Sequence, residues 1–234
     1  KRFQLQFVVK SEQLLRDAIS AWGISKRALT AIKFDGGELL VNGEERNVRY
    51  SLQPGDTVMI IFPKEVVSEG LIAQYDELPI VYEDEAVLII DKPTYMSTIP
   101  SREHPIGSVA NLLYGYFERQ QIASTAHIVT RLDRDTSGLM IVAKHRHIHH
   151  LMSEQQKKGN VHREYEALVH GRVACDQSII APIGRKDTSI IEREVRDDGQ
   201  FAHTDVKVIT KTAGMSHIRL KLHTGRTHQI RVHM

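Results

Sequence analysis

The sequence contains a single cysteine, Cys175, among its 234 residues. One cysteine excludes an internal disulfide framework and any zinc or iron–sulfur site built from several cysteines, and it fits a reducing compartment. Long apolar runs are also missing: none approaches the roughly 18 residues of a membrane span. The first residues lack the apolar core of a signal peptide. We therefore expect a cytoplasmic protein with no membrane contact.

Neither sign of charge is in large excess. The chain has 31 Lys and Arg against 29 Asp and Glu, a net charge of +2, which excludes an extreme polybasic or acidic protein and identifies no partner. By segment, residues 63–126 carry a net −6, whereas residues 127–234 carry a net +6 and twelve of the thirteen histidines. A basic C-terminal half suits a polyanionic partner, although an unevenly charged, solvated surface explains the count equally well.

Helical spacing of apolar residues marks the start of the chain. It predicts a helix over residues 11–22, with Ser11 as its N-cap, and a second helix over residues 25–34. The second helix would expose Lys26 and Arg27 in its first turn, where cations oppose the helix dipole. Basic side chains there are candidate contacts for an anionic partner, and an ordinary solvated helix end is the alternative.

Composition divides the chain into three segments. Residues 1–62 combine two helices with short strands and a hairpin signal at residues 42–43, which predicts a compact module. Residues 63–78 are acidic and show no sustained periodicity, so we predict a linker. Residues 79–234 hold many strand-like runs that do not alternate regularly with helices, which favours an α+β fold.

The most unusual stretch is residues 131–138 (RLDRDTSG), which precede an apolar strand predicted over residues 139–143. Guanidinium groups on both sides of Asp133 favour the ionised carboxylate. An ionised carboxylate suits nucleophilic or electrostatic work rather than acid catalysis. A surface turn held by ion pairs and capped by Asp135 or Ser137 is the structural alternative.

Residues 222–233 (LHTGRTHQIRVH) are too polar for a plain core element. A helix beginning after Gly225 would place His228 and Arg231 on one face. The alternative is a basic phosphate-binding surface.

Two further stretches carry weaker signals. In a strand over residues 163–171, Tyr165 would lie on the face of a sheet, which is more often a core position than an active-site one. Four histidines within residues 145–150 suggest a metal site, but the segment offers no nearby cysteine or well-placed carboxylate, so we predict none.

Taken in their order along the chain, three of these stretches resemble the motifs of RNA pseudouridine synthases of the RluA/RluD type, the ribosomal large-subunit family. The family signature H-R-L-D-x-x-T-S-G matches residues 130–138, with Thr130 in place of His. The signature K-x-Y-x-A-x-V-x-G matches residues 163–171, with Arg163 in place of Lys. The signature T-G-R-[ST]-H-Q-[IL]-R-V-H matches residues 224–233 throughout.

Weaker elements extend the resemblance over nearly the whole chain. The family's A-x-T element is present at residues 202–204, and its early Lys-Pro pair at residues 92–93. Residues 1–62 resemble the S4-like RNA-binding module that many members carry. The resemblance implies an α+β protein in which this small domain precedes a mixed, mainly antiparallel catalytic domain over residues 79–234. Family members continue beyond the last matched motif, so we expect the catalytic domain to be incomplete at Met234.

The resemblance also implies roles for individual residues. Asp133 matches the catalytic aspartate, and Arg131 matches the side chain that enters the RNA stack where the target uridine leaves. Tyr165 matches the aromatic residue that packs on the extruded base, and Arg231 matches the arginine that pairs with the catalytic carboxylate. We expect a monomer that needs no metal and no cofactor and acts on RNA, ribosomal RNA in the first instance.

Three interpretations of function follow. The favoured one is an RNA uridine isomerase in which Asp133 attacks the sugar or the pyrimidine, or removes a sugar proton to give a glycal. The second is a non-catalytic RNA-binding or ribosome-assembly factor on the same scaffold. The third, a hydrolase using Asp133 and Asp135, is weaker because no acid with a raised pKa is evident.

Overall fold

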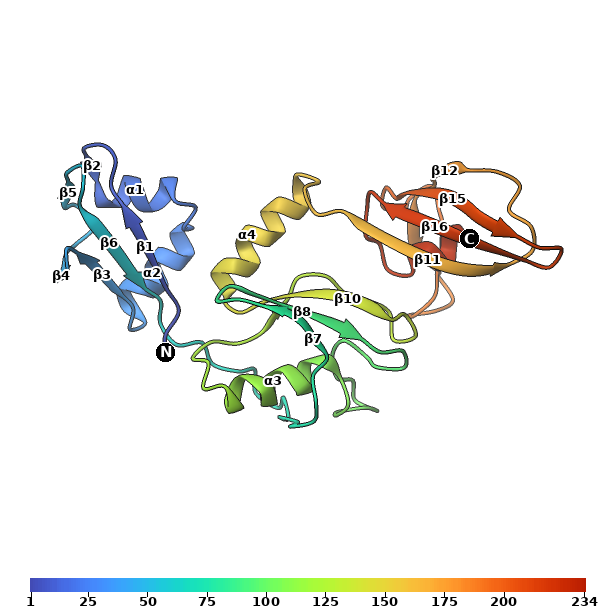
Figure 1. Cartoon of the computed structure of the whole chain (residues 1–234), viewed down its shortest axis with the longest axis horizontal. Coiled ribbons are helices and arrows are strands. Elements are labelled where there is room, and N and C mark those ends of the chain that lie inside the picture. Colours follow the sequence, from blue (N-terminus) through green and yellow to red (C-terminus); the bar gives the residue numbers. More distant parts are fainter. The chain divides into compact units, whose positions relative to one another are not determined.

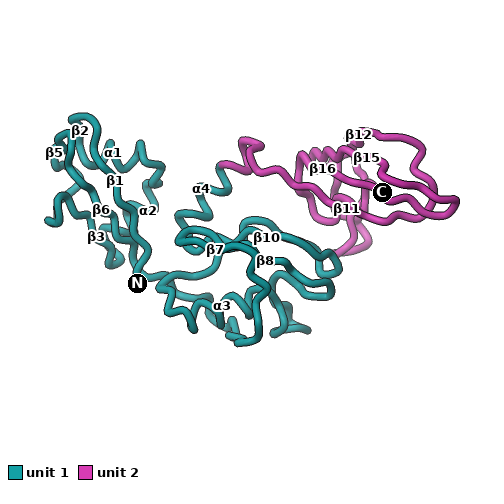
Figure 2. The backbone as a smooth tube through the Cα atoms, viewed as in Figure 1, with its two compact units in different colours: residues 1–154 teal, residues 155–234 magenta.

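A computed structural model describes all of residues 1–234 and divides into two compact units, Lys1–Glu154 and Gln155–Met234 (Figure 2). This division lies inside the region predicted as one catalytic domain, so the units do not coincide with the predicted segments, whose boundaries stay predictions. Every sheet is antiparallel, and helices do not alternate regularly with strands. The α+β expectation is therefore confirmed, with antiparallel rather than mixed sheets.

The first part of unit 1 is a four-stranded sheet, in the order β1-β6-β3-β4, that shares one apolar core with two helices (Figure 1). The buried members of that core all lie between Val9 and Phe62, and Leu15, Leu52 and Ile60 are fully buried. The segment therefore supplies its own core. Its elements are β1 (Gln4–Val8), β2 (Gln13–Leu14), α1 (Leu15–Ala21), α2 (Lys26–Phe34), β3 (Glu38–Val41), β4 (Glu44–Glu45), β5 (Ser51–Leu52) and β6 (Thr57–Ile61).

Helix α1 is shorter than predicted. It begins at Leu15, and Ser11 is not its N-cap, because Gln13 and Leu14 pair with Ser51 and Leu52 in a short antiparallel ladder. Those two residues satisfy main-chain groups by strand pairing, which the helical spacing of apolar side chains does not reveal.

The predicted second helix and hairpin are confirmed. The Ser25 hydroxyl accepts a hydrogen bond from the Ala28 N–H at 3.1 Å, so Ser25 caps α2. Between β3 and β4, Asn42 and Gly43 have φ angles of 52° and 85°. Two consecutive positive φ values define the turn that matches the twist of a hairpin.

The second part of unit 1 is the sheet β7-β8-β10-β9 with helix α3 (Figure 1). The preceding residues 63–78 contain no helix or strand. A capping box between Ser108 and Asn111 starts α3, and Tyr116 donates a hydrogen bond to Glu83 of β7 at 2.6 Å. The elements are β7 (Ile80–Glu83), β8 (Val87–Lys92), α3 (Val109–Arg119), β9 (His127–Ile128) and β10 (Gly138–Ala143); α4 (Arg146–Lys157) follows and spans the division between the units.

Unit 2 is built on the sheet β11-β16-β15-β12. Val206, Ile218 and Leu220 form the centre of its core. Its elements are β11 (Arg163–His170), β12 (Gln177–Ile180), β13 (Ile183–Arg185), β14 (Arg193–Val195), β15 (His203–Lys211), β16 (Met215–Leu222) and α5 (Gln229–His233).

None of these helices combines the length and the apolarity needed to cross a lipid bilayer.

Candidate functional site

The 131–138 loop is fastened at its start by two threonine hydroxyls. Thr130 Oγ1 accepts a hydrogen bond from the Ile141 N–H of β10 at 2.9 Å. Thr98 Oγ1 donates to the Leu132 carbonyl at 2.9 Å, and Leu132 is buried. Thr130, which departs from the family's histidine, therefore supports the loop through its own hydroxyl. Arg131, between these fixed points, is exposed, and Asp133, directly after Leu132, is half-buried.

A buried lysine lies beneath the same loop. Lys92 has an exposed fraction of 0%, and it shares the inward face of β8 with Leu88 and Ile90. Burial lowers the pKa of Lys92, while the charges of Asp135 and Asp133 oppose that shift. Its Nζ donates to three main-chain carbonyls, those of Met96 at 2.8 Å, Pro93 at 3.0 Å and Arg134 at 3.0 Å.

These contacts give Lys92 a double role. It joins the end of β8 to the middle of the loop, and the charges of the two loop aspartates act on its ammonium group. In the sequence, Lys92 stands out only as part of a Lys-Pro pair, which implies no role for its side chain. The alternation of Leu88, Ile90 and Lys92 along a strand was the signal that could have identified it.

In unit 2, the third family motif (residues 224–233) is hydrogen-bonded to the A-x-T element (residues 202–204). Gln229 Nε2 donates to Thr204 Oγ1 at 2.9 Å and to the His203 carbonyl at 3.1 Å. Thr224 Oγ1 accepts from the His203 N–H at 2.9 Å and donates to Gln229 Oε1 at 2.8 Å. His233 Nδ1 lies 2.8 Å from Thr204 Oγ1. Two motifs distant in the sequence thus form one hydrogen-bonded network.

The second family motif (residues 163–171) covers β11 and contacts the third family motif. Residues of β11 alternate between half-buried and exposed, as predicted, and Tyr165 packs against the core that contains Ile218 and Leu220. The guanidinium of Arg163 lies directly over Gly225, where an added Cβ would come within 2.1 Å of Arg163 Nη1. A side chain at position 225 would therefore displace the Arg163 guanidinium, the flexible end of that side chain, from its present place.

Arg231 lies in α5, but the prediction that His228 shares a face of the same helix with it is wrong. The helix begins only at Gln229, and His228 precedes it in the left-handed conformation with φ 57°. Both side chains nevertheless line one cleft of about 490 Å³ between α5 and the β13–β14 hairpin. Lys186 and Arg193 line it too, together with Glu192 and Glu194, so the cleft carries charges of both signs.

The predicted site residues therefore fall into two groups. Asp133 and Arg131 belong to unit 1, together with the exposed Lys26 and Arg27 of α2. Tyr165 and Arg231 belong to unit 2.

Two of the histidines at the start of α4, His145 and His147, are buried in apolar packing and not exposed to solvent. His145 and His147 are each 4% exposed and lie against the ring of Phe62. Burial lowers the pKa of both to about 4, so they are neutral at pH 7. His145 Nδ1 accepts the His147 N–H at 3.1 Å, which leaves the proton on Nε2, 3.4 Å from Glu65 Oε1. Burial alone would raise the pKa of Glu65, but hydrogen bonds, chiefly from His127, lower it to about 2.

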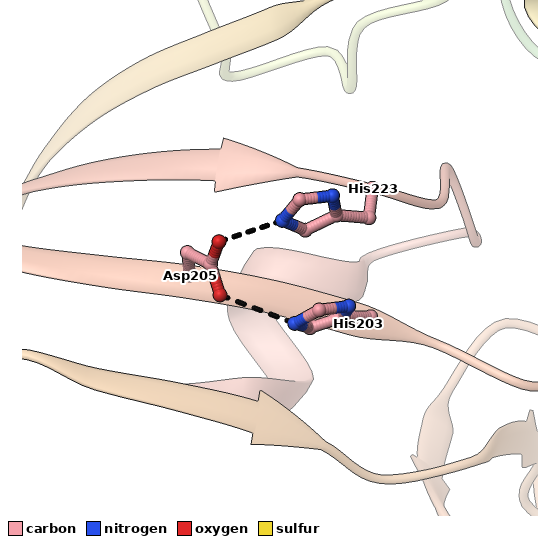
Figure 3. A group of neighbouring side chains, drawn as sticks. All are labelled: His203, Asp205 and His223. Atoms are coloured by element: carbon pink, nitrogen blue, oxygen red, sulfur yellow. Dashed lines mark hydrogen bonds and ion pairs between the residues drawn. The ribbon is translucent and has the colours of Figure 1, made fainter. Parts of the chain in front are cut away.

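One cluster of side chains is not predicted from the sequence. On unit 2, His203 and His223 both direct Nε2 at the carboxylate of Asp205 (Figure 3), at 3.1 Å and 2.6 Å. Ser178 also donates to this carboxylate. The hydrogen bonds from Ser178 and then His223 lower the pKa of Asp205 to about 2. The His-x-Asp spacing was visible in the sequence, whereas the contribution of His223 depends on strand pairing.

Two solved human structures have a similar fold. RNA pseudouridylate synthase domain containing 1 gives a TM-score of 0.56 at 24% identity, covering 69% of this chain and 65% of that one. RNA pseudouridylate synthase domain containing 4 gives a TM-score of 0.53 at 22% identity, covering 66% of this chain and 62% of that one. This chain thus spans less than two thirds of either solved chain.

Sequence relatives are closer. A Bacillus subtilis protein named uncharacterized RNA pseudouridine synthase YjbO is 54% identical over 213 residues, which are 91% of this chain and 75% of the relative. Ribosomal large subunit pseudouridine synthase D of Pseudomonas aeruginosa is 36% identical over 231 residues, which are 99% of this chain and 72% of the relative. Residues 86–234 match the family described as RNA pseudouridylate synthase. The chain therefore belongs to the RNA pseudouridylate synthase family, whose members are isomerases acting on RNA.

Proposed function

We propose that this protein converts uridines of large-subunit ribosomal RNA into pseudouridines, with Asp133 as the catalytic group. The observation that carries the proposal is the position of Asp133 in a loop held by a buried lysine. The choice of ribosomal RNA is supported by the relative named ribosomal large subunit pseudouridine synthase D.

The reaction breaks the C1′–N1 bond of uridine and forms a C1′–C5 bond. The C5 proton is released to solvent and N1 takes up a proton, so the product is an isomer of uridine. A stacked base cannot turn over in this way, so the uridine must leave the stack at a cost of a few kcal/mol. The exposed Arg131 would fill the vacated position. Tyr165 would give the base a stacking face worth about 1–3 kcal/mol.

Arg231 completes the proposed set. As the resemblance implies, its guanidinium would pair with the catalytic carboxylate during the reaction. In the α5 cleft, Arg193 would then receive a phosphate of the RNA strand, whereas Lys186 is paired with Glu192 at 2.8 Å.

The first turn of α2 is the proposed RNA contact outside the catalytic region. Lys26 and Arg27 are exposed there, and that turn contains no acidic residue. Their charges add to the positive end of the helix dipole, and a phosphate would neutralise both.

Replacing Lys26 and Arg27 together with alanine is expected to weaken RNA binding about tenfold at low salt and to reduce the salt dependence of log Kd by about two. Lys33→Ala is the matched control, because Lys33 is exposed in the last turn of the same helix. Filter binding at several salt concentrations measures both quantities. An unchanged salt slope in the double variant would remove these residues from the RNA contact.

The proposed activity is tested with ribosomal RNA transcripts carrying tritium at uridine C5. We expect the protein to release tritium to water in proportion to the pseudouridine recovered from the RNA. An RNA-binding factor would retain the RNA with steep salt dependence and release no tritium. A hydrolase would liberate free uracil instead. Either of these results would contradict the proposal.

A further inference from the structure

We propose that His203, Asp205 and His223 form a binding site for a divalent d-block cation, with Zn²⁺ as its first candidate. The site lies on unit 2 and is independent of the proposed isomerase activity. It contains two imidazoles and one carboxylate, a donor set that zinc accepts in proteins.

Strand pairing brings the three side chains together. β15 and β16 are antiparallel neighbours, and Thr204 is paired with Leu222, so His203 and His223 adjoin the same rung. The His223 N–H also donates to the His203 carbonyl at 3.1 Å. Asp205 is two residues beyond His203 on the same strand and therefore points to the same face of the sheet. Figure 3 shows both imidazoles directed at the Asp205 carboxylate, that of His203 from the same strand and that of His223 from the end of the neighbouring strand β16.

Distances between the ligand atoms suit a metal ion. One atom from each of the three residues lies within 4.8 Å of the others. Zinc bonds of about 2.0–2.2 Å in a tetrahedral arrangement place ligand atoms about 3.3–3.5 Å apart. His203 Nε2 is already 3.1 Å from Asp205 Oδ1, and His223 Nε2 is 2.6 Å from Oδ2. Each of these two nitrogen–oxygen distances would have to lengthen by less than about 1 Å when the ion binds.

The preference among cations follows from the same donors. Imidazole nitrogen suits zinc, copper and nickel, whereas magnesium and calcium prefer oxygen ligands throughout. The three side chains are half-buried or exposed, so an ion can enter from solvent and keep a water as its fourth ligand. The Ser178 hydroxyl, 2.8 Å from His203 Nε2, would hold that water or a ligand.

The site is joined to the third motif through the main chain. His203 donates its N–H to Thr224 and accepts from Gln229 with its carbonyl, and both partners belong to the motif that contains Arg231. An ion shared between β15 and β16 would fix the strand ends from which this motif leaves the sheet. Zinc binding is therefore expected to raise the melting temperature of the protein, since it binds only the folded arrangement.

The test is calorimetric titration of the EDTA-treated protein with Zn²⁺ near pH 7.5. We expect the protein to bind one ion. His203→Gln and His223→Gln should each lower the zinc affinity more than about tenfold, because even residues that only hydrogen-bond to metal ligands contribute about 10–100-fold to metal affinity. His217→Gln is the matched control. His217 is also a sheet histidine paired with a carboxylate, that of Glu166, at 3.1 Å. The second partner of Glu166, however, is Arg219 and not another histidine.

Two further measurements separate loss of ligands from loss of fold. Asp205→Asn retains the shape of the side chain, so it should fold normally, judged by circular dichroism, and still lose the zinc-dependent rise in melting temperature. Co²⁺ should give visible absorption with the unaltered protein and the His217→Gln variant, but not with the ligand variants. Equal zinc affinity in all variants, or no binding by the unaltered protein, would overturn the site.

Discussion

An Asp133→Asn variant is expected to lose tritium release by about 1000-fold or more while binding RNA as the unaltered protein does. The amide has nearly the shape of the carboxylate, but it neither attacks carbon nor accepts a proton at a useful rate. The loop itself should persist, because the hydrogen bonds made by Thr98, Thr130 and Lys92 are untouched by the substitution.

Asp135→Asn is the matched control for that experiment. Asp135 lies in the same loop, and its charge acts on Lys92 as that of Asp133 does. Loss of a general electrostatic contribution would therefore affect both variants, whereas loss of the catalytic group affects only Asp133→Asn. We expect Asp135→Asn to retain activity within about tenfold of the unaltered protein. Equal and complete loss in both variants would favour a paired-carboxylate mechanism instead.

The second large effect is expected at Lys92. Lys92→Met keeps the length of the side chain but removes the donor of three hydrogen bonds, so the carbonyls of Pro93, Met96 and Arg134 lose their shared partner. Each buried acceptor without a partner costs about 1–3 kcal/mol, which is offset in part because a buried charge is also removed. We expect the free energy of unfolding to fall by about 3 kcal/mol.

Activity of Lys92→Met should fall about 100-fold even well below its melting temperature, since a displacement of about 1 Å at a catalytic group has that effect. Lys144→Met is the control. Lys144 pairs with Glu83 at 2.7 Å and follows the far end of β10 from the loop. It should lose less than about 1 kcal/mol of stability and keep its activity. A Lys92→Met variant with the normal rate would show that the lysine does not position Asp133.

Most regular elements could be predicted from apolar spacing and local turn chemistry. The Ser25 cap and the Asn42–Gly43 hairpin depend on neighbouring residues alone, so they were visible in the sequence. Helix α1 was predicted too long because its first residues pair with Ser51 and Leu52, about forty positions away. The beginning of α5 was misplaced because His228 adopts a positive φ, for which a histidine gives no clear signal.

The candidate site shows the same limit. Asp133 stood out because two arginines flank it in the sequence. The importance of Lys92 was missed because a lysine at the end of a strand is usually exposed, and only the structure gives its exposed fraction of 0%. The cluster of His203, Asp205 and His223 depends on the register of β15 against β16, which no local pattern specifies.

The central claim is that this protein forms pseudouridine in ribosomal RNA through Asp133. Its most direct test is to map pseudouridines at single-nucleotide resolution in large-subunit RNA from two strains, one with the unaltered protein and one with Asp133→Asn as its only copy. We predict that at least one modified position is lost completely in the variant strain, while the others are unchanged. Identical maps from the two strains would contradict the claim.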